Sequence, residues 1–273
     1  MERELAGKVA LVTGATRMRG LGRAIAVVLA GAGADVIVTG TASGSASRPE
    51  DEVQAGWRGF PDIVAELESL GVRARGIAVD VTDADGVQAM VREAVTCMGR
   101  VDILVNNATY PRGSDRVPVV DLDESVWRRI VDVNLTGTML CCKYVAREMI
   151  RQGDGGSIVN ISSGAALKAP ATFSAYAASK AAVHALTSAL AAELGPHGIT
   201  CNVVAPGFLD TARIDMLRRP DKWTERLTTI PIPRAGQPAE VAQLVRFLCG
   251  PHARWMSGDA LLVNGGEVRR AAG

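Results

Sequence analysis

The sequence predicts an α/β fold: a single, doubly wound domain built on a mostly parallel, seven-stranded sheet with helices on both faces. Two observations lead to this prediction. Short β-branched segments alternate with helical patterns along the whole 273-residue chain, which is the order of successive βαβ units. These segments are also apolar throughout rather than at every second residue, as expected of parallel strands that are buried on both faces. Right-handed crossovers then wind such a chain into a doubly wound sheet.

Seven strands and six helices are predicted, and no segment rich in Pro, Gly or Ser divides them. The expected strands are Val9–Thr13, Val36–Thr39, Gly76–Val79, Ile103–Asn106, Ser157–Ile161, Thr200–Ala205 and Ala260–Val263. The expected helices cover about residues 20–32, 61–70, 83–98, 124–151, 175–195 and 238–249. We therefore expect residues 1–273 to form one domain.

Two segments fall outside this alternation. Residues 41–59 (TASGSASRPEDEVQAGWRG) form a long polar insertion after the second strand, and loops of this length are usually functional or mobile. A solvated surface loop is the alternative. Residues 208–234 follow the sixth strand and contain Pro220, Pro231 and Pro233. Because open α/β sheets bind ligands at the carboxyl ends of their strands, we expect this second segment to be a substrate lid.

The composition argues against several classes of function. Acidic and basic residues nearly balance, with a formal charge of +1, so neither nucleic acid nor a membrane surface is an expected partner. The five cysteines show no metal-ligand spacing, and their odd number does not indicate a disulfide framework. Residues 1–8 are charged and too short for a signal peptide, and no apolar run reaches membrane-spanning length. We expect a cytoplasmic protein without a metal site.

A tyrosine and a lysine four positions apart give the strongest functional signal. Tyr176 and Lys180 fall on one face of a predicted helix, one turn from each other. A phenol serves as an acid/base only if its pKa falls below the usual value of about 10, and a nearby ammonium lowers that pKa by favouring the phenolate. Ser163, thirteen residues before the tyrosine, could hold the substrate oxygen. The three residues together predict proton exchange with an oxygen of the substrate.

A glycine-rich loop joins the first predicted strand to the first predicted helix. Its sequence is TGATRMRGLG, residues 13–22, with glycines at positions 14, 20 and 22. Glycines at such a turn permit a tight bend and the close approach of a pyrophosphate, which then lies at the helix N-terminus. This placement predicts a dinucleotide-binding site.

The end of the second predicted strand indicates which dinucleotide binds. An acidic residue there would bind the ribose hydroxyls and repel a 2′-phosphate, but this chain has TGTAS at residues 39–43. Arg17 in the glycine loop, with Arg19 or Arg48 as helpers, could pair with that phosphate. We therefore predict NADP(H) as the favoured cofactor. NAD(H) is the alternative if Arg17 is only a solvated charge.

Taken together, these motifs resemble the short-chain dehydrogenase/reductase family, from about Leu5 to Gly266. Further motifs follow in the family's order: Asp80 in DVTD, Asn106-Asn107-Ala108, Asn134 in VNLTG, Pro206-Gly207 with Thr211, and Asn264-Gly265-Gly266. Within the family the chain is most similar to the group that contains 3-oxoacyl-carrier-protein reductases. The resemblance implies a Rossmann domain that transfers hydride between a nicotinamide cofactor and a carbonyl or secondary alcohol.

The resemblance also implies a role for each matching residue. Tyr176 would be the general acid/base, Lys180 would lower its pKa and hold the nicotinamide ribose, and Ser163 would orient the reacting oxygen. Asn134 would hold a water in the proton relay. Ser162 competes with Ser163, but Ser163 has the family's spacing to the tyrosine. Besides Tyr176 and Lys180, the expected cofactor contacts are Gly14, Thr16, Arg17, Gly20, Leu21, Gly22, Thr41, Asp80, Val81, Asn107, Ala108, Pro206, Gly207, Leu209 and Thr211.

Two positions depart from the family's pattern. Five residues separate Gly14 from Gly20, where the family usually has three, so the placement of Arg17 against a 2′-phosphate is open. Thr109 stands where the family usually has glycine, and its side chain could narrow the floor of the substrate site or shift the local backbone.

Two other functions share this fold. A non-catalytic dinucleotide sensor would be favoured by loss of the tyrosine, lysine or serine, and all three are present. An isomerase or dehydratase of this kind usually carries a larger C-terminal substrate domain than the roughly sixty residues that follow Gly207. An oxidoreductase acting on a small molecule is therefore the prediction, and its substrate is not identified.

Residues near the expected substrate site leave its polarity open. Arg112, Asp115 and Arg116 follow Ala108 and could meet a polar substrate or form a solvated loop. The aromatic residues expected near the site are Tyr110, Phe173, Phe208 and Trp223.

The helix that carries Tyr176 also predicts self-association. From Ala175 to Leu194 its only formally charged residues are Lys180 and Glu193, whereas a surface helix should show a polar stripe. The predicted helix over 124–151 has a similar apolar excess in Met139, Leu140, Cys141, Cys142, Tyr144 and Val145. Two such helices per subunit, paired across a two-fold axis, predict a homotetramer, with a dimer as the fallback.

Overall fold

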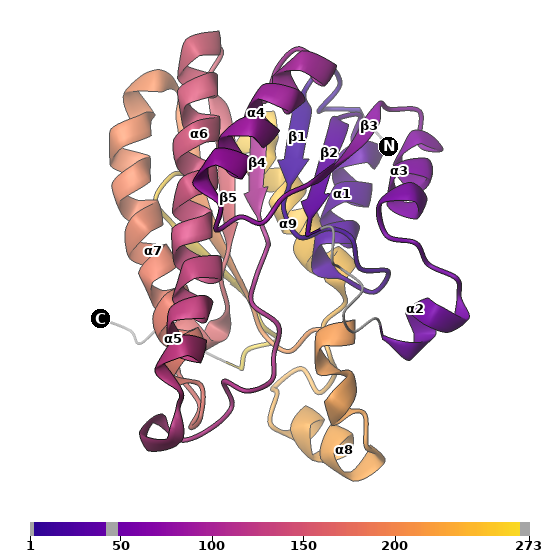
Figure 1. The fold of residues 1–273 in the computed structure, drawn as a ribbon, viewed down its shortest axis with the longest axis vertical. Helices are drawn as coiled ribbons and strands as arrows, with labels where there is room; N and C mark the ends of the chain where they lie inside the picture. Colours follow the sequence, from indigo (N-terminus) through magenta and orange to yellow (C-terminus); the bar gives the residue numbers. More distant parts are fainter. Residues whose placement is uncertain (1–2, 42–48, 268–273) are drawn as a thin grey trace.

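Seven strands within the described residues, 3–41 and 49–267 of this computed structural model, form one sheet in which all neighbouring pairs are parallel (Figure 1). Their order is β3-β2-β1-β4-β5-β6-β7, so the winding direction reverses between β1 and β4. The strands are β1 Val9–Val12, β2 Asp35–Gly40, β3 Ala74–Ala78, β4 Ile103–Asn106, β5 Gly156–Ile161, β6 Ile199–Pro206 and β7 Ala260–Val263. The predicted doubly wound α/β fold is confirmed, and every predicted strand is present.

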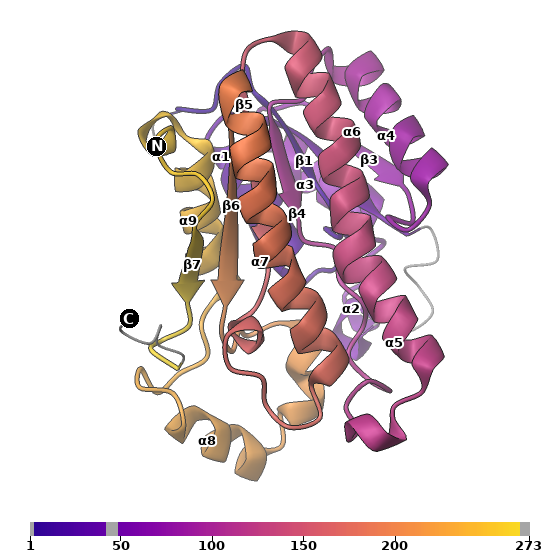
Figure 2. The ribbon, with the colours of Figure 1, turned by 90° about the vertical axis from the view of Figure 1, so that its left-hand side faces the viewer.

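Helices cover both faces of this sheet (Figures 1 and 2). One face is covered by α1 Leu21–Gly31, α3 Phe60–Glu68 and α9 Pro238–Cys249. The other is covered by α4 Ala84–Met98, α6 Gly137–Gln152 and α7 Ser174–Leu194. Shorter helices are α2 Glu50–Gln54, α5 Glu124–Val131 and α8 Pro220–Thr228.

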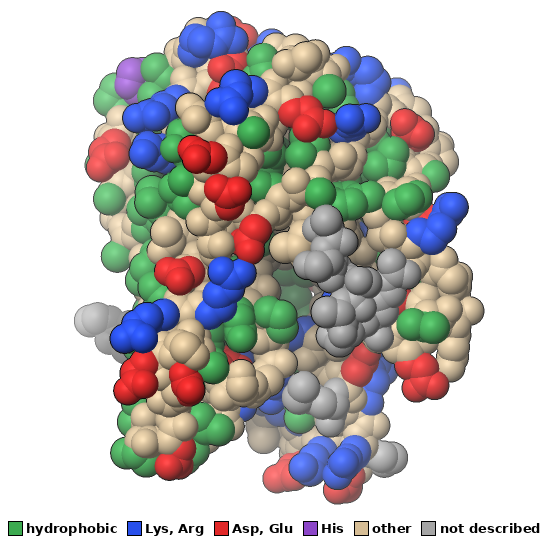
Figure 3. All heavy atoms as spheres, in the orientation of Figure 1, with side chains coloured by type: hydrophobic (Ala, Val, Ile, Leu, Met, Phe, Trp, Pro, Cys, Tyr) green, Lys and Arg blue, Asp and Glu red, His purple; other side chains and the backbone are tan. Residues whose placement is uncertain are grey.

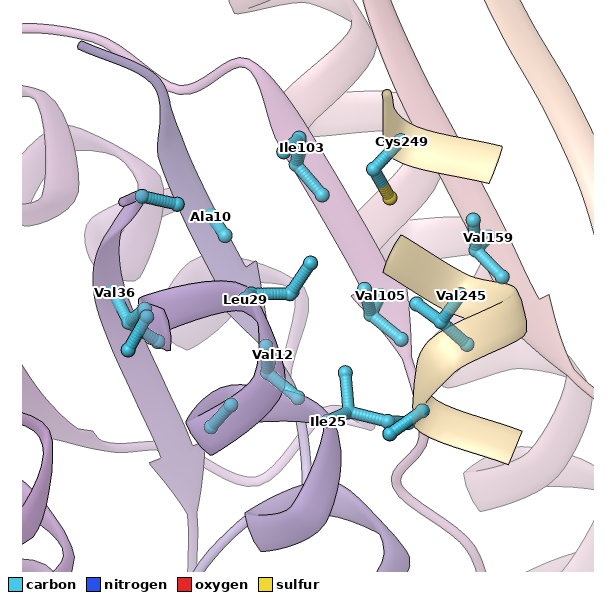
Figure 4. Close-up of a cluster of buried hydrophobic side chains, with 14 of the residues drawn as sticks. Ala10, Val12, Ile25, Leu29, Val36, Ile103, Val105, Val159, Val245 and Cys249 are labelled. Carbon is cyan, nitrogen blue, oxygen red and sulfur yellow. The ribbon is translucent and has the colours of Figure 1, made fainter. Parts of the chain in front are cut away.

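The central strands contribute to two hydrophobic cores, one on each face. In β1, Ala10 and Val12 pack with α1 and α9, while Val9 and Leu11 pack with α4 and α6. This alternation follows from the two-residue repeat of a strand, and it explains why the strand sequences are apolar throughout. Burying each Val, Leu or Ile contributes about 1.5–3 kcal/mol. Figure 4 shows the first core, with Ala10, Val12, Ile25, Leu29, Val36, Ile103, Val105, Val159, Val245 and Cys249 labelled.

The predicted helix over residues 124–151 is present as one continuous helical segment, but it contains a π turn that the sequence did not predict. A π-helical turn, Asp132–Thr136, separates α5 from α6. A π turn adds a residue without interrupting the helical backbone, so the sequence shows neither a proline nor a polar break there. At the start of α6 the chain passes close to Val81: a Cβ added to Gly137 would lie 2.6 Å from Val81 Cγ2. The turn also carries Asn134 into the protein interior, where it is fully buried.

The two irregular segments lie at the carboxyl ends of the strands, to which the arrows in Figure 1 point. The predicted insertion contains α2, and its residues 42–48 lie outside the described residues. The predicted lid contains a 3₁₀ segment, η5 Ala212–Leu217, followed by α8. Both segments therefore lie at the end of the sheet where open α/β folds bind ligands.

Acidic and basic side chains are interspersed over the face shown in Figure 3. None of the helices in the described part of the chain has the length and apolar character required to cross a membrane. Among the same residues there is also no cluster of three or more His, Cys, Asp or Glu side chains suited to a metal ion.

Candidate active site

The predicted site residues follow the carboxyl ends of several strands of the sheet. Residues 14–22 follow β1, Asp80 and Val81 follow β3, and Asn107 and Ala108 follow β4. Ser163 follows β5. Ligands of open α/β sheets bind where the strand order reverses, and here that point lies between β1 and β4. The fold therefore gathers at one edge the motifs that the sequence distributes over about two hundred residues.

Glycines are required in the loop after β1 because the backbone is packed closely there. Gly14 has φ +66°, and a Cβ on it would lie 2.8 Å from Ala108 Cα. A Cβ on Gly22 would lie 2.5 Å from both Gly14 O and Asn107 Nδ2. Gly20 is the N-cap residue of α1 and has extended backbone. A larger side chain at Gly14 or Gly22 would displace the loop from β4.

The start of α1 suits an anion. Within the described residues, no side chain caps the N-terminus of α1, and its first turn contains no acidic residue. The first N–H groups of the helix are therefore left for a ligand. Asn107 Nδ2 donates to Thr13 O and Gly14 O at 2.9 Å each, which fixes the loop against β4. A crowded glycine turn that leads into uncapped N–H groups fits the diphosphate of a dinucleotide.

The insertion folds onto this glycine loop. Glu52 of α2, only 2% exposed, accepts from Arg17 Nη1 at 3.1 Å and from Met18 N at 2.7 Å. Trp57 Nε1 donates to Thr16 O at 2.8 Å. The described part of the insertion is therefore attached to the glycine loop through Glu52 and Trp57, although most of its other residues are exposed. Arg17, which was predicted to meet a 2′-phosphate, already has a carboxylate partner.

Arg19 joins the glycine loop to two other segments. Its guanidinium pairs with Asp51 of α2 and with Asp215 of η5, in the predicted lid, and its carbonyl accepts from Ala212 N at 3.0 Å. The hydrogen bond to Asp51 is the main cause that raises the pKa of Arg19 above its ordinary value. The third predicted phosphate partner, Arg48, lies outside the described residues. The extra length of the glycine loop thus connects the insertion with the lid.

Helix α7 carries Tyr176 and Lys180 one turn apart, as predicted. Lys180 is 3% exposed, and its Nζ donates to Ile161 O at the end of β5, at 2.8 Å. Burial lowers the pKa of Lys180 from its ordinary 10.5 to about 7, and the positive charge of Arg213 contributes to the same shift. Tyr176 packs edge-on against Phe173, with 6.4 Å between the ring centres.

The surroundings of the two serines after β5 distinguish between them. Ser162 is buried, and its hydroxyl donates to Lys180 O at 3.0 Å and lies 2.8 Å from His184 Nε2. Ser163 is only partly buried, and its hydroxyl accepts from Ala165 N at 3.2 Å. The hydroxyl of Ser163 keeps its proton for another acceptor, whereas that of Ser162 is used inside the protein.

The buried Asn134 side chain joins the segment after β4 to α7. Its Oδ1 accepts from Thr109 Oγ1 at 3.0 Å and from Tyr110 N at 2.8 Å, and its Nδ2 donates to Ser179 Oγ at 2.9 Å. Ser179 in turn donates to Tyr176 O at 2.8 Å. Thr109, the departure from the family's glycine, is therefore a hydrogen-bond donor to Asn134.

Several known proteins are similar to this chain in sequence and in fold. A family model described as Enoyl-(Acyl carrier protein) reductase matches residues 14–267. The short-chain reductase protein NovJ of Streptomyces niveus is 40% identical over 265 residues, which cover 95% of this chain and 93% of that protein. The 3-oxoacyl-[acyl-carrier-protein] reductase FabG of Aquifex aeolicus is 37% identical over 268 residues, covering 97% and 99%. The chain belongs to the short-chain dehydrogenase/reductase family.

A solved structure agrees with this assignment to the short-chain dehydrogenases/reductases. The short chain dehydrogenase from Burkholderia cenocepacia J2315, in complex with NADP, superposes with a TM-score of 0.82 at 37% identity. The match covers 97% of this chain and 99% of that one. The suspected resemblance to the family is confirmed, and so is its Rossmann-type fold.

Other residues that were predicted to contact the cofactor in this short-chain dehydrogenase/reductase fix the loops that follow the strands. Asp80 accepts from Thr82 N at 3.0 Å and from Arg129 Nη2 at 2.8 Å. A Cβ on Gly207 would lie 2.8 Å from Asn264 Cα, so Gly207 allows the loop after β6 to pass the end of β7. Leu209 forms a parallel bridge with Gly236, which joins the two ends of the segment that was predicted to be a lid.

The segment after Ala108 is not a solvated loop in this short-chain dehydrogenase/reductase. Asp115 is 1% exposed; its carboxylate pairs with Arg116 and accepts from Gly113 N at 3.1 Å. Burial lowers the pKa values of Arg112 and Arg116. The sequence reasoning also missed Arg213, whose guanidinium carbon lies 5.2 Å from the centre of the Tyr176 ring. Its position two residues after Thr211 was the available signal.

Proposed function

We propose that this protein is a cytoplasmic enzyme that reduces a carbonyl compound, or oxidises the corresponding secondary alcohol, with NADP(H). The observation that carries the proposal is the placement of Tyr176 and the buried Lys180 on one helix, beside the end of β5, after which Ser163 keeps its hydroxyl hydrogen for a ligand. The nicotinamide, when bound, supplies or accepts the hydride. The protein's residues orient the substrate oxygen and exchange its proton.

Each of the three residues has a distinct role in this proposal. Ser163 donates its hydroxyl hydrogen to the substrate carbonyl and holds it beside the phenol. Tyr176 gives its proton to that oxygen as the carbonyl becomes an alcohol, and takes it back in the reverse reaction. The ammonium of Lys180 stabilises the phenolate that Tyr176 leaves behind.

We assign two roles to Asn134. It positions α7, and it holds a water of the proton relay. The three hydrogen bonds of its side chain hold α7 at a fixed distance from the segment after β4. Its backbone carbonyl accepts from Thr138 Oγ1 at 2.8 Å, and a carbonyl oxygen has a second lone pair. A water at that lone pair would connect the buried interior to Lys180.

NADP(H) is supported by two observations. The relative from Burkholderia cenocepacia was solved with NADP, and β2 of this chain ends at Gly40 and is followed by Thr41 rather than by an acidic residue. In our proposal Arg17 binds the 2′-phosphate while Glu52 holds its guanidinium from the other side. We expect NADPH to bind more tightly than NADH, and wild-type enzyme to reduce at least one member of a ketone panel with NADPH.

Two substitutions test the role of Arg17. Arg17→Ala should narrow the difference in dissociation constant between NADPH and NADH by about tenfold, the value of one charge-assisted hydrogen bond. Glu52→Gln should widen it, because it removes a negative charge beside the phosphate and keeps a partner for Met18 N. Fluorescence titration measures both, with the exposed Arg92→Ala as control. Equal or tighter binding of NADH would contradict the cofactor proposal, and a panel without turnover would contradict the reaction.

Self-association remains a proposal, and part of its sequence basis is wrong. Leu140, Cys141, Cys142 and Val145 lie in the core of the single chain, because α6 packs them against the sheet and α4. The apolar face of α7 remains, with exposed small residues Ala178, Ala181, Ala185, Ser188 and Ala189.

From that face of α7 we expect a homotetramer, with a dimer as the fallback. Light scattering at micromolar concentration should report a mass of four, or two, chains of 28.6 kDa. A stable monomer would refute the proposal.

A further inference from the structure

Three arginines surround the ring of Tyr176 and its neighbour Phe173. Arg112 and Arg116 come from the segment after β4, and Arg213 comes from η5 in the lid. The guanidinium carbons of Arg116 and Arg213 lie 4.8 and 5.2 Å from the centre of the Tyr176 ring. Those of Arg116 and Arg112 lie 3.9 and 5.7 Å from the centre of the Phe173 ring. Two segments far apart in the sequence thus bring positive charge to the proposed proton donor.

This cluster is not neutralised by the protein groups that contact it in the described structure. Asp115 supplies the carboxylate of the cluster, and this carboxylate pairs with Arg116. Arg213 donates to a neutral acceptor, Tyr110 O, at 2.7 Å. Three guanidinium groups and one carboxylate leave an excess of two positive charges. The Arg116 side chain is 13% exposed, and keeping unpaired charge away from water is costly unless a counter-ion is present.

The cluster also contains hydrogen-bond donors without acceptors. Within the described residues, the buried atoms Arg112 Nε, Arg116 Nε and Arg213 Nη2 have no partner. Buried N–H groups are almost always bonded, so three unpaired donors beside one ring indicate an acceptor that binds there. Water could accept these hydrogens but would leave the excess charge. A group with two or more anionic oxygens satisfies both, and guanidinium groups bind such oxygens in pairs.

We propose that the substrate is an oxo acid, whose anionic group is bound by Arg112, Arg116 and Arg213 while its carbonyl lies at Ser163 and Tyr176. The proposal rests on the reaction proposed above and adds the class of substrate. Since the guanidinium groups surround the same ring whose hydroxyl meets the carbonyl, the anion is only a few bonds from the reacting carbon. The chemistry shared by the candidates is an anionic oxygen group, either a carboxylate or a phosphate.

Matched pairs of ketones test this proposal with the intact enzyme and NADPH. The pairs are 2-, 3- and 4-oxo acids against their amides, and a 2-oxoalkyl phosphonate against its dimethyl ester. A neutral 3-oxobutanoyl thioester is included as well. We expect kcat/KM to be at least about tenfold higher for one anionic member than for its neutral partner, as for one charge-assisted contact. The preferred member, carboxylate or phosphonate, identifies the anion.

Variants show whether the arginines cause that preference. Arg213→Gln and Arg116→Gln should bring the ratio of kcat/KM for the acid over its amide close to one, mainly through KM, and Arg213→Lys should restore part of it. Arg219→Gln, an exposed position in the same lid, removes the same charge and should keep the ratio. If Arg116→Gln does not fold, the lid variant Arg213→Gln alone decides.

The outcomes separate this proposal from the reaction on which it rests. An active wild-type enzyme that reduces the amides or the thioester as efficiently as the acids would overturn the anion proposal and leave the reaction standing. If no ketone is reduced, the proposed reaction is contradicted, and a binding measurement then tests whether the three arginines bind an anion. Succinate or inorganic phosphate should then raise the melting temperature of wild type more than that of Arg213→Gln. Equal shifts would overturn the proposal.

Discussion

Replacing Tyr176 with phenylalanine is expected to lower kcat by about 10²–10⁴-fold, the usual contribution of a positioned acid/base. Only the phenolic hydroxyl is removed, so the packing of the ring against Phe173 and Arg116 should be retained. NADPH should bind nearly as well as to wild type. Steady-state reduction of the best ketone measures the first effect, and fluorescence titration with NADPH measures the second.

Tyr144→Phe is the matched control for this loss. Tyr144 lies on α6 and packs against Lys143 and Arg147, so losing its hydroxyl should not affect turnover. A Tyr176→Phe enzyme that kept more than a few per cent of wild-type activity would exclude Tyr176 as the proton donor.

Lys180→Met is expected to reduce kcat, to weaken cofactor binding and to change how stability depends on pH. In the unfolded chain the lysine pKa is near 10.5, whereas burial in the folded protein lowers it to about 7. Between these values the unfolded state holds a proton that the folded state has lost. The free energy of unfolding of the cofactor-free protein should therefore rise as pH increases from about 7 to about 10.

The methionine variant has no proton to lose at this position, so its stability should not show this rise. It should gain most over wild type below about pH 7, and the two free energies should approach each other above about pH 10. Urea unfolding at several pH values measures the difference. Lys168→Met, at an exposed position, should follow wild type. Parallel curves for wild type and Lys180→Met would show that the buried ammonium is not destabilising.

The fold was predictable because its signals are local. The central strands are short, mostly apolar runs, as in Val9–Val12 or Ile103–Asn106, and such a run can be recognised without knowledge of the neighbouring strands. The division between α5 and α6 was not predictable for the opposite reason. Asn134 lies in the π turn at Asp132–Thr136, and the hydrogen-bond partners of its side chain are far away in the sequence, at Thr109, Tyr110 and Ser179.

Some residues of the candidate site were predictable from local sequence spacing, and others were not. Tyr176 and Lys180 lie on one helix, as their spacing predicted, and Ser163 directly follows β5, the strand that precedes this helix along the chain. Glu52 and Arg213 were not predicted. Glu52 meets Arg17 across 35 residues of sequence, and Arg213 meets Tyr110 across 103. A local sequence pattern does not predict a contact between an insertion and a loop, or between the predicted lid and a strand end.

The bridge made by Arg19 has a consequence for comparing and recombining such proteins. In the sequence the lengthened glycine loop, residues 13–22, and the insertion, residues 41–59, are two separate segments. In the folded chain they are one unit, because Arg19 joins Asp51 of the insertion to Asp215 of the lid. A chimera that received only one of the two would place a carboxylate opposite no cation, or an arginine opposite no carboxylate. Loop, insertion and lid should therefore be inherited, and transplanted, together.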